Sequence, residues 1–359
     1  MVPAENSHRI SRRSLGLGGS AVLVAGAASG VPSPNAFAAG ANRAGSPVLE
    51  TVRGPVRGDD VRRALAHEHF FVDFLGPTAD EYMNVDWTDA TGAAVNAARE
   101  LRAQRVNLVI DWTCLGVGRN VSYLRDVSRQ TGVHIVAATG IYKSLVPPAL
   151  ERASIDDMAA HFATELTRGI DGTNIRAGFI KCATTESGPT ASDTRVHRAA
   201  ARAARSTGAT IALHCPHAEA ANTVADTLEG EGFDLRRLLW GHAQVSSSAA
   251  HLAMTKRGAS VQFDAIGAES DPFFEGPTDD ASMLDRIQAM VEAGFGHRVT
   301  VSNDASVVVH PPIYQYDRDP LYLYRTFYRK LVNRLGHEQA RQVTRDNVVR
   351  IFRRGARVG

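Results

Sequence analysis

The chain has 359 residues, of which 44% are hydrophobic and 22% charged, a composition that is ordinary for a folded protein with a large core. Its formal net charge is only +2, which gives no electrostatic basis for binding nucleic acid or for stable attachment to an anionic membrane. The three cysteines are odd in number and lack tight spacing, which argues against a disulfide framework.

The first 38 residues have the pattern of an export signal. Ser11-Arg12-Arg13-Ser14-Leu15 precedes a weakly hydrophobic stretch rich in glycine and alanine, and Ala36-Phe37-Ala38 is a cleavage signal of the small-x-small type. This order predicts a twin-arginine signal peptide over residues 1–38 and an exported protein, either secreted or held at the cell surface or in the periplasm. The alternative is an uncleaved anchor, but the stretch is too weakly apolar to hold well in a bilayer. Residues 39–359 are predicted to form a single domain.

Short apolar runs alternate with helical patterns through this second part of the chain. Eight runs are predicted strands: 64–70, 106–113, 133–139, 175–182, 210–214, 238–242, 260–263 and 299–302. Segments such as 90–104 and 191–207 have helical spacing, and several are closed by glycine just before the next strand, as at Gly132, Gly208 and Gly258. Eight strand–helix repeats predict a parallel sheet that closes into a (β/α)₈ barrel.

Six polar residues fall at the ends of these predicted strands: His67, His69, Lys181, His214, His242 and Asp304. Side chains alternate along a strand, so the two histidines of Leu65-Ala66-His67-Glu68-His69 face the same side. A lone lysine closing an apolar strand would be costly to bury unless it had a chemical role. Barrels of this class place their chemistry at the C-terminal strand ends. Because nitrogen and carboxylate ligands on converging strands suit zinc, the pattern predicts a two-metal hydrolase site.

Other histidines and the cysteines are predicted to have structural roles. His217 is a rival for the position of His214, but His214 follows its apolar run directly. Cys182 and Cys215 each follow a candidate ligand, so they should face the surrounding helices as small buried apolar side chains. Three more histidines are expected to be structural or exposed: His134, His161 and His251.

Four segments carry a resemblance to a known family: 66–69, 132–140, 175–185 and 301–304. They closely resemble bacterial phosphotriesterases and the phosphotriesterase-like lactonases of the amidohydrolase superfamily. The resemblance implies that His67 and His69 hold the more buried of two divalent metal ions together with Asp304, and that His214 and His242 hold the more exposed one. It also implies that Lys181 is carboxylated on its amine and bridges the ions. A desolvated lysine has a depressed pKa, which leaves a neutral amine able to add carbon dioxide.

The same resemblance implies a reaction. A hydroxide that bridges the two metal ions attacks the substrate, while Asp304 accepts its proton. Tyr142 points to a lactone or carboxylic ester as the small-molecule substrate, because the lactonase-like branch carries tyrosine where phosphotriesterases carry tryptophan; the alternative is a rim residue without a substrate role. Phosphotriester hydrolysis, N-acyl amide hydrolysis and metal binding without turnover stay open. A homodimer is suggested by analogy with the family alone.

Two positions depart from the pattern of the family. Val245 stands where many members carry an aspartate three residues after the sixth-strand histidine, and Asp264-Ala265 stands where an Asp-His or Asp-Arg pair is usual. Those residues help to pass the proton on to solvent, so the route beyond Asp304 is predicted to be shortened or redirected. Ester and lactone hydrolysis tolerates this well, because the proton can pass to the leaving alkoxide.

Overall fold

The structure is a computed structural model that describes residues 46–269, 276–312 and 318–354. The described residues form one compact unit. The predicted signal segment, residues 1–38, lies outside the described residues. Within the described ranges, no helix combines the length and the apolar character needed to cross a bilayer.

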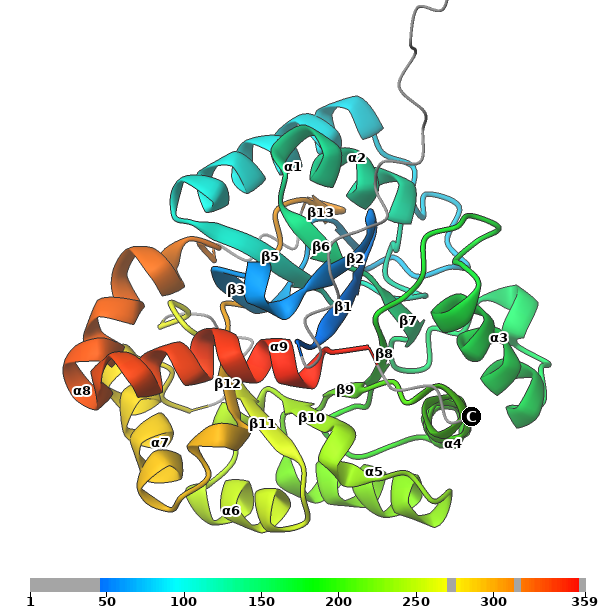
Figure 1. Cartoon of the computed structure of the whole chain (residues 1–359). Helices are drawn as coiled ribbons and strands as arrows, with labels where there is room; N and C mark the ends of the chain where they lie inside the picture. The colour runs from blue at the N-terminus through cyan, green and yellow to red at the C-terminus, as the bar shows by residue number, and fades with distance from the viewer. Residues whose placement is uncertain (1–45, 270–275, 313–317, 355–359) are drawn as a thin grey trace, which may run out of the picture. The chain divides into compact units, whose positions relative to one another are not determined.

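Parallel strands that alternate with helices along the chain build the barrel wall (Figure 1). The strands are β3 (Arg63–Glu68), β5 (Val106–Asp111), β6 (His134–Val136), β7 (Ala138–Ile141), β8 (Phe179–Ala183), β9 (Ile211–His214), β10 (Leu238–Gly241), β11 (Ser260–Phe263) and β12 (Val299–Val301). Their order is β3–β5–β6 in one sheet and β7–β8–β9–β10–β11–β12 in the other. Only Ala137 separates β6 from β7, so the two together take the place of one strand of the barrel.

The wall closes where the chain that follows β12 meets β3. The backbone N–H of Asp304 donates to the carbonyl of His67 at 3.0 Å. The hydroxyl of Ser302 accepts from the backbone N–H groups of Ala66 and His67, both at 2.9 Å. These bonds join the two sheets, which confirms the predicted (β/α)₈ barrel.

Helices surround the strands in Figure 1. They are α1 (Trp87–Ala103), α2 (Val121–Thr131), α3 (Ile155–Thr167), α4 (Ala191–Thr207), α5 (Ala218–Gly230), α6 (Ser248–Lys256), α7 (Asp280–Glu292) and α8 (Tyr328–Arg341). The helix predicted over 191–207 is confirmed as α4, because Thr190 and Asp193 form a capping box at its start and Gly208 adopts a left-handed conformation at its end. The helix predicted over 90–104 begins earlier, since Asp86 caps the N–H groups of Thr88 and Asp89.

A short helix near the C-terminus covers part of the end of the barrel at which the strands begin. The C-terminal α9 (Asn347–Ile351) lies near the starts of two strands: the ring of Phe352 packs 5.0 Å from that of Phe179, and the Thr210 hydroxyl donates to the Ile351 carbonyl at 2.6 Å. The remaining strands form two pairs, β1 (Val48–Thr51) with β2 (Gly54–Arg57) and β4 (Val72–Asp73) with β13 (Val309–His310).

Of the predicted strands, only 260–263 has the same limits in the structure, and three of the differences bear on the site. β3 ends at Glu68, so His69 lies just past the strand, where its backbone N–H bonds to the carbonyl of Ala305 in the chain that follows β12. β8 begins only at Phe179, which places Lys181 at its middle and not at its end. The strand predicted over 133–139 is divided into β6 and β7.

The cysteines are buried and free, as the sequence predicts. Cys182 and Cys215 pack in the cluster between the wall and the helices, whereas Cys114 packs in the interior cluster with Trp112 and Phe179. All three therefore serve as small apolar side chains.

Candidate metal centre

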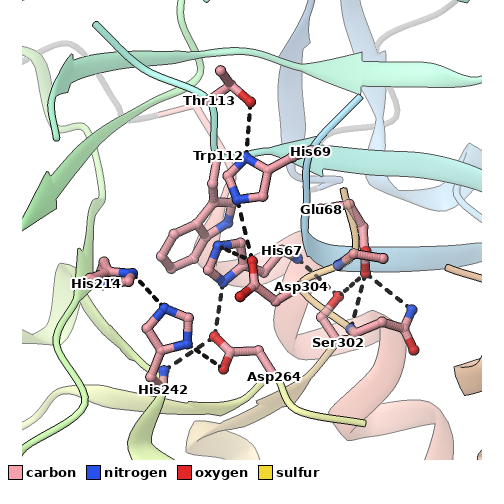
Figure 2. Close-up of polar contacts among 12 residues, drawn as sticks. His67, Glu68, His69, Trp112, Thr113, His214, His242, Asp264, Ser302 and Asp304 are labelled. Atoms are coloured by element: carbon pink, nitrogen blue, oxygen red, sulfur yellow. Dashed lines mark hydrogen bonds and ion pairs between the residues drawn. The ribbon is translucent and has the colours of Figure 1, made fainter. Parts of the chain in front are cut away.

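All six predicted site residues lie at the C-terminal end of the barrel. His67 lies on β3 and His69 directly after it, Lys181 lies on β8, and His214 ends β9. His242 follows β10 and Asp304 follows β12 by three residues. Figure 2 shows the following side chains gathered here: His67, His69, His214, His242, Asp264 and Asp304. One pocket is lined by the following residues: His69, Val72, Phe74, Val117, Tyr142, Lys181, His214, Asp304, Ser306 and Arg318.

One group of donor atoms is formed by His67, His69 and Asp304. Oδ1 of Asp304 lies 3.1 Å from Nε2 of His67 and 3.3 Å from Nε2 of His69. Nε2 of His67 is buried and has no hydrogen-bond partner among the described residues. Two imidazole nitrogens that converge on one carboxylate oxygen in a buried position are an arrangement that suits a cation.

The second nitrogen of each of these histidines is held by the protein. Nδ1 of His67 donates to Oδ2 of Asp264 at 2.8 Å. Nδ1 of His69 donates to the Thr113 hydroxyl at 2.9 Å, because the proton of that hydroxyl is itself given to the Phe71 carbonyl at 3.0 Å. Burial lowers the pKa of His67 to about 3, so its imidazole is neutral at pH 7. Nε2 of His67 is therefore free of a proton and available as a ligand. Nε2 of His69 faces the same carboxylate oxygen.

His214 and His242 form the second group. Nδ1 of His214 faces Nε2 of His242 at 2.5 Å. The other nitrogens are again engaged: Nδ1 of His242 donates to Oδ1 of Asp264 at 2.8 Å, and Nε2 of His214 lies 3.3 Å from the Tyr142 hydroxyl. Burial holds the pKa of His214 well below its usual value. This pair can offer two more nitrogen ligands, directed into the same pocket.

Asp264 links the two groups, and sequence reasoning did not assign it a role. Besides both imidazoles it accepts a hydrogen bond from the side-chain amide of Gln244 at 3.0 Å. Burial would raise the pKa of Asp264, but His242 and His67 outweigh it and hold the pKa below its usual range. Distances of 2.8 Å to both Nδ1 atoms are those of N–H···O bonds, so Asp264 orients the histidines rather than acting as a ligand. Asp264 directly follows β11. The same position, a polar residue directly after an apolar strand, pointed to His214 and His242 in the sequence.

Asp304 is held in place from the side opposite the histidines. Nη1 of the buried Arg318 donates to Oδ2 of Asp304 at 2.7 Å and to its carbonyl at 2.8 Å. Against the effect of burial, His67 and Arg318 keep the pKa of Asp304 well below its usual value. Asp304 has a φ of +51° and His242 a φ of +59°, a left-handed conformation that costs of order 1–3 kcal/mol for residues other than glycine.

Glu68, between the two histidines of β3, secures the loop that carries Asp304. Its Oε1 accepts hydrogen bonds from the Ser302 hydroxyl at 2.8 Å and from the backbone and side-chain N–H groups of Asn303 at 3.0 and 3.1 Å. Its Oε2 accepts from the backbone N–H of Ala305 at 2.8 Å. Burial raises the pKa of Glu68 to about 8 in spite of these bonds. Nothing in the sequence pattern pointed to this residue.

Lys181 is 1% exposed, and burial lowers the pKa of its amine to about 8. Its Nζ lies 4.0 Å from the centre of the Trp112 ring, and within the described part of the chain it has no hydrogen-bond or ion-pair partner. Gly140 allows the neighbouring β7 to approach, because a side chain there would collide with the backbone of Lys181. A buried amine without a partner, beside neutral imidazoles and a carboxylate, fits the donor set of a metal pair.

Four other histidines that the sequence analysis considered do not line the pocket: His134, His161, His217 and His251. His217 precedes the first residue of α5 and does not cap it with its side chain. The other three have structural contacts: His134 with Arg53, His161 with Glu165 and His251 with the Ala243 carbonyl.

Comparison with known proteins gives the family of this chain. Residues 47–352 match the model described as the phosphotriesterase family. The chain belongs to the phosphotriesterase family. A phosphotriesterase homology protein of Escherichia coli is 32% identical over 280 residues, which cover 76% of this chain and 91% of that protein. A variant of a phosphotriesterase-like lactonase from Deinococcus radiodurans has a similar structure, with a TM-score of 0.76 and 31% identity over 85% of this chain and 99% of that one.

More distant members of the phosphotriesterase family have differing names. An aryldialkylphosphatase of Saccharolobus solfataricus is 28% identical over 69% of this chain and 78% of that protein. An N-acetyltaurine hydrolase of Rattus norvegicus is 26% identical over 71% of this chain and 83% of that protein. The resemblance seen in the sequence is thereby confirmed, and the relatives are named as hydrolases of more than one kind of bond.

Proposed function

We propose that this family member is a hydrolase that uses two divalent metal ions, with zinc as the expected metal, to cleave lactone or carboxylic ester bonds. One observation carries the proposal. Each of four histidines has one nitrogen engaged by the protein and directs the other toward the space shared with Asp304 and Lys181. Such orientation of ligands by outer partners is typical of metal sites.

The donor atoms divide into two sets. We assign Nε2 of His67, Nε2 of His69 and Oδ1 of Asp304 to one ion, and Nδ1 of His214 with Nε2 of His242 to the other. Lys181, carboxylated on Nζ, is assigned to both. The ions, when bound, lower the pKa of a water molecule and polarise the substrate carbonyl.

Two of the protein's own side chains, Asp304 and Tyr142, have tasks in this reaction. The carboxylate of Asp304 is held by Arg318 through Oδ2 and faces His67 and His69 through Oδ1. This carboxylate accepts a proton from the attacking water. The hydroxyl of Tyr142, beside His214, is placed to orient the substrate carbonyl.

Ser306 and Arg318, which is paired with Asp304, are also part of the pocket wall. Three further lining side chains are apolar: Val72, Phe74 and Val117. They can exclude water and accept the hydrocarbon part of an acyl group. An apolar wall favours an uncharged lactone or ester over a charged N-acyl amide, because a charged group would lose its hydration there. Phosphotriester hydrolysis is the second candidate, since the same donors serve it and an aryldialkylphosphatase is among the relatives.

A substrate panel tests the proposal. The zinc-loaded protein is assayed with an acyl lactone, a p-nitrophenyl ester, diethyl p-nitrophenyl phosphate and N-acetyltaurine. We expect the highest kcat/KM for the lactone or the ester. A clear preference for the phosphotriester or for the amide would contradict the proposal, and retained zinc without any turnover would support a binding protein instead.

We further propose that the chain is exported by the twin-arginine pathway. The support is the order of Arg12-Arg13, the weakly apolar stretch and Ala36-Phe37-Ala38 in the sequence. Replacing both arginines, as Arg12→Lys with Arg13→Lys, is expected to keep the protein in the cytoplasm with its leader attached. Export of that variant at the normal level, measured by fractionation and mass spectrometry of the N-terminus, would contradict the proposal.

A further inference from the structure

Trp112 directly follows β5 and lies against the histidines of the candidate metal centre (Figure 2). We propose that Trp112 is a positioning residue, which sets the plane of the His67 imidazole and thereby the zinc affinity of the group formed by His67, His69 and Asp304. This inference rests on the proposed function.

The contacts of Trp112 with β3 determine both the place and the tilt of the indole. Its ring is stacked on that of His67, with centroids 3.7 Å apart and planes 15° from parallel. Its Nε1 donates to the Ala66 carbonyl at 2.7 Å, so the indole is anchored to the residue immediately before His67. The indole is fully buried and cannot move away into solvent.

The same indole reaches two more strands that carry candidate ligands. On β8, the amine of Lys181 lies 4.0 Å from the ring centre. On β10, a Cβ added to Gly241 would lie 3.1 and 3.2 Å from Cη2 and Cζ3 of the indole, so the ring occupies the space beside the residue before His242. One rigid side chain therefore packs against the strands of three candidate ligands.

The stack provides a restraint that the hydrogen bond of His67 does not. The bond from Nδ1 to Asp264 holds one nitrogen in place, but small coupled rotations about the Cα–Cβ and Cβ–Cγ bonds can still tilt the plane of the imidazole. A parallel ring at 3.7 Å blocks these rotations, which keeps Nε2 directed at Oδ1 of Asp304. Loss of partners that orient a ligand typically costs about 10- to 100-fold in metal affinity.

The test is zinc binding by the full chain after metal removal, measured by competition with a chelator. In Trp112→Phe we expect one of the two zinc equivalents to bind about 10- to 100-fold more weakly, with a clearly smaller loss at the other. Trp87→Phe is the matched control, because Trp87 is a half-buried ring that packs on Phe71 and Tyr123 away from the pocket.

Two outcomes with Trp112→Phe would overturn the inference. One is wild-type affinity at both equivalents. The other is an equal loss at both, accompanied by a lower Tm of the metal-free protein, which indicates that Trp112 only fills space. Failure of the wild-type protein to bind zinc would refute the proposed function instead, so the two failures are distinguishable.

A second measurement does not depend on the folding of Trp112→Phe. The chain has three tryptophans, so a Trp87→Phe/Trp240→Phe variant leaves Trp112 as the sole indole emitter. We expect its fluorescence to change as zinc is added and to reach a plateau with the equivalent that fills the His67 group. Constant emission while zinc binds would contradict contact between Trp112 and a zinc ligand.

Discussion

Single residues prepare the candidate centre for metal before any metal binds. His67 is kept neutral by burial, and the hydrogen bond to Asp264 decides which of its nitrogens carries the proton. His242 is oriented by the other oxygen of the same carboxylate. Because two imidazoles from different strands share Asp264 as acceptor, this carboxylate fixes the position of the two donor groups relative to each other as well as the orientation of each.

Removal of the Lys181 amine should empty the centre. In Lys181→Ala we expect loss of most bound zinc and at least about a 100-fold fall in ester hydrolysis, since metal ions supply several kcal/mol of transition-state stabilisation. Short carboxylic acids should partly restore both, because they can take the place of a carbamate. Elemental analysis and the ester assay measure the two effects.

The matched control for Lys181→Ala is Lys143→Ala, at a lysine near the pocket whose amine lies 3.7 Å from the Glu186 carboxylate. It should keep its zinc. Unchanged zinc content in Lys181→Ala would count against the bridging role of that lysine.

The metal-free protein should be stabilised by removing this buried amine, in a manner that depends on pH. The pKa of Lys181 is about 8 in the folded state, whereas the ordinary value of 10.5 applies to the unfolded chain. The unfolded chain therefore binds the proton of this amine more tightly. The resulting penalty, of order 3 kcal/mol, is complete below pH 8 and disappears as the pH rises to 10.5. Metal-free Lys181→Met should therefore be more stable than the wild type at pH 7, and urea unfolding should show this advantage shrinking between pH 8 and 10.5. An advantage that is constant over this range would argue against the lowered pKa.

Among the elements, β3 and the loop after β12 act as one unit. Ser302 joins them through the backbone of Ala66 and His67, and Glu68 accepts four hydrogen bonds from residues 302–305. The barrel seam and the position of Asp304 consequently depend on the same side chains. Stability and metal binding should be lost together when this unit is disturbed.

Glu68→Gln tests that dependence. An amide has one oxygen, so either the donors on Ser302 and Asn303 or the N–H of Ala305 must face the new NH₂ group without an acceptor. We expect a loss of about 2–3 kcal/mol in the free energy of unfolding, together with weaker zinc binding. Urea unfolding and chelator competition measure the two effects.

Glu100→Gln, on an exposed part of α1, is the matched control for Glu68→Gln and should change neither quantity by much. A Glu68→Gln variant with wild-type zinc affinity would show that the loop holds Asp304 without Glu68.

For the whole molecule, the candidate ligands lie on or just after β3, β8, β9, β10 and β12, so a metal pair would hold together strands on both sides of the seam. Ligands that bind only the folded state raise its stability according to their free concentration. At 100 times the dissociation constant we expect zinc to add about 2.7 kcal/mol per site, seen as a higher Tm by calorimetry in zinc buffers. In Lys181→Ala the increase of Tm with zinc should be much smaller. A wild-type Tm that does not change with zinc would refute the proposed zinc centre.

The sequence by itself determined the barrel and the residues that could serve as ligands. Both depend on local order: apolar runs of strand length alternate with helices, and polar residues follow those runs at His214, His242 and Asp304. Tertiary structure alone decided what surrounds them. Asp264 reaches His67 across 197 positions, Glu68 reaches the loop after β12 across more than 230, and the indole of Trp112 stacks on His67 from another strand. The two-residue period of a strand predicts to which side each of its side chains points. Which side chains from different strands meet inside the barrel is decided only when the barrel closes.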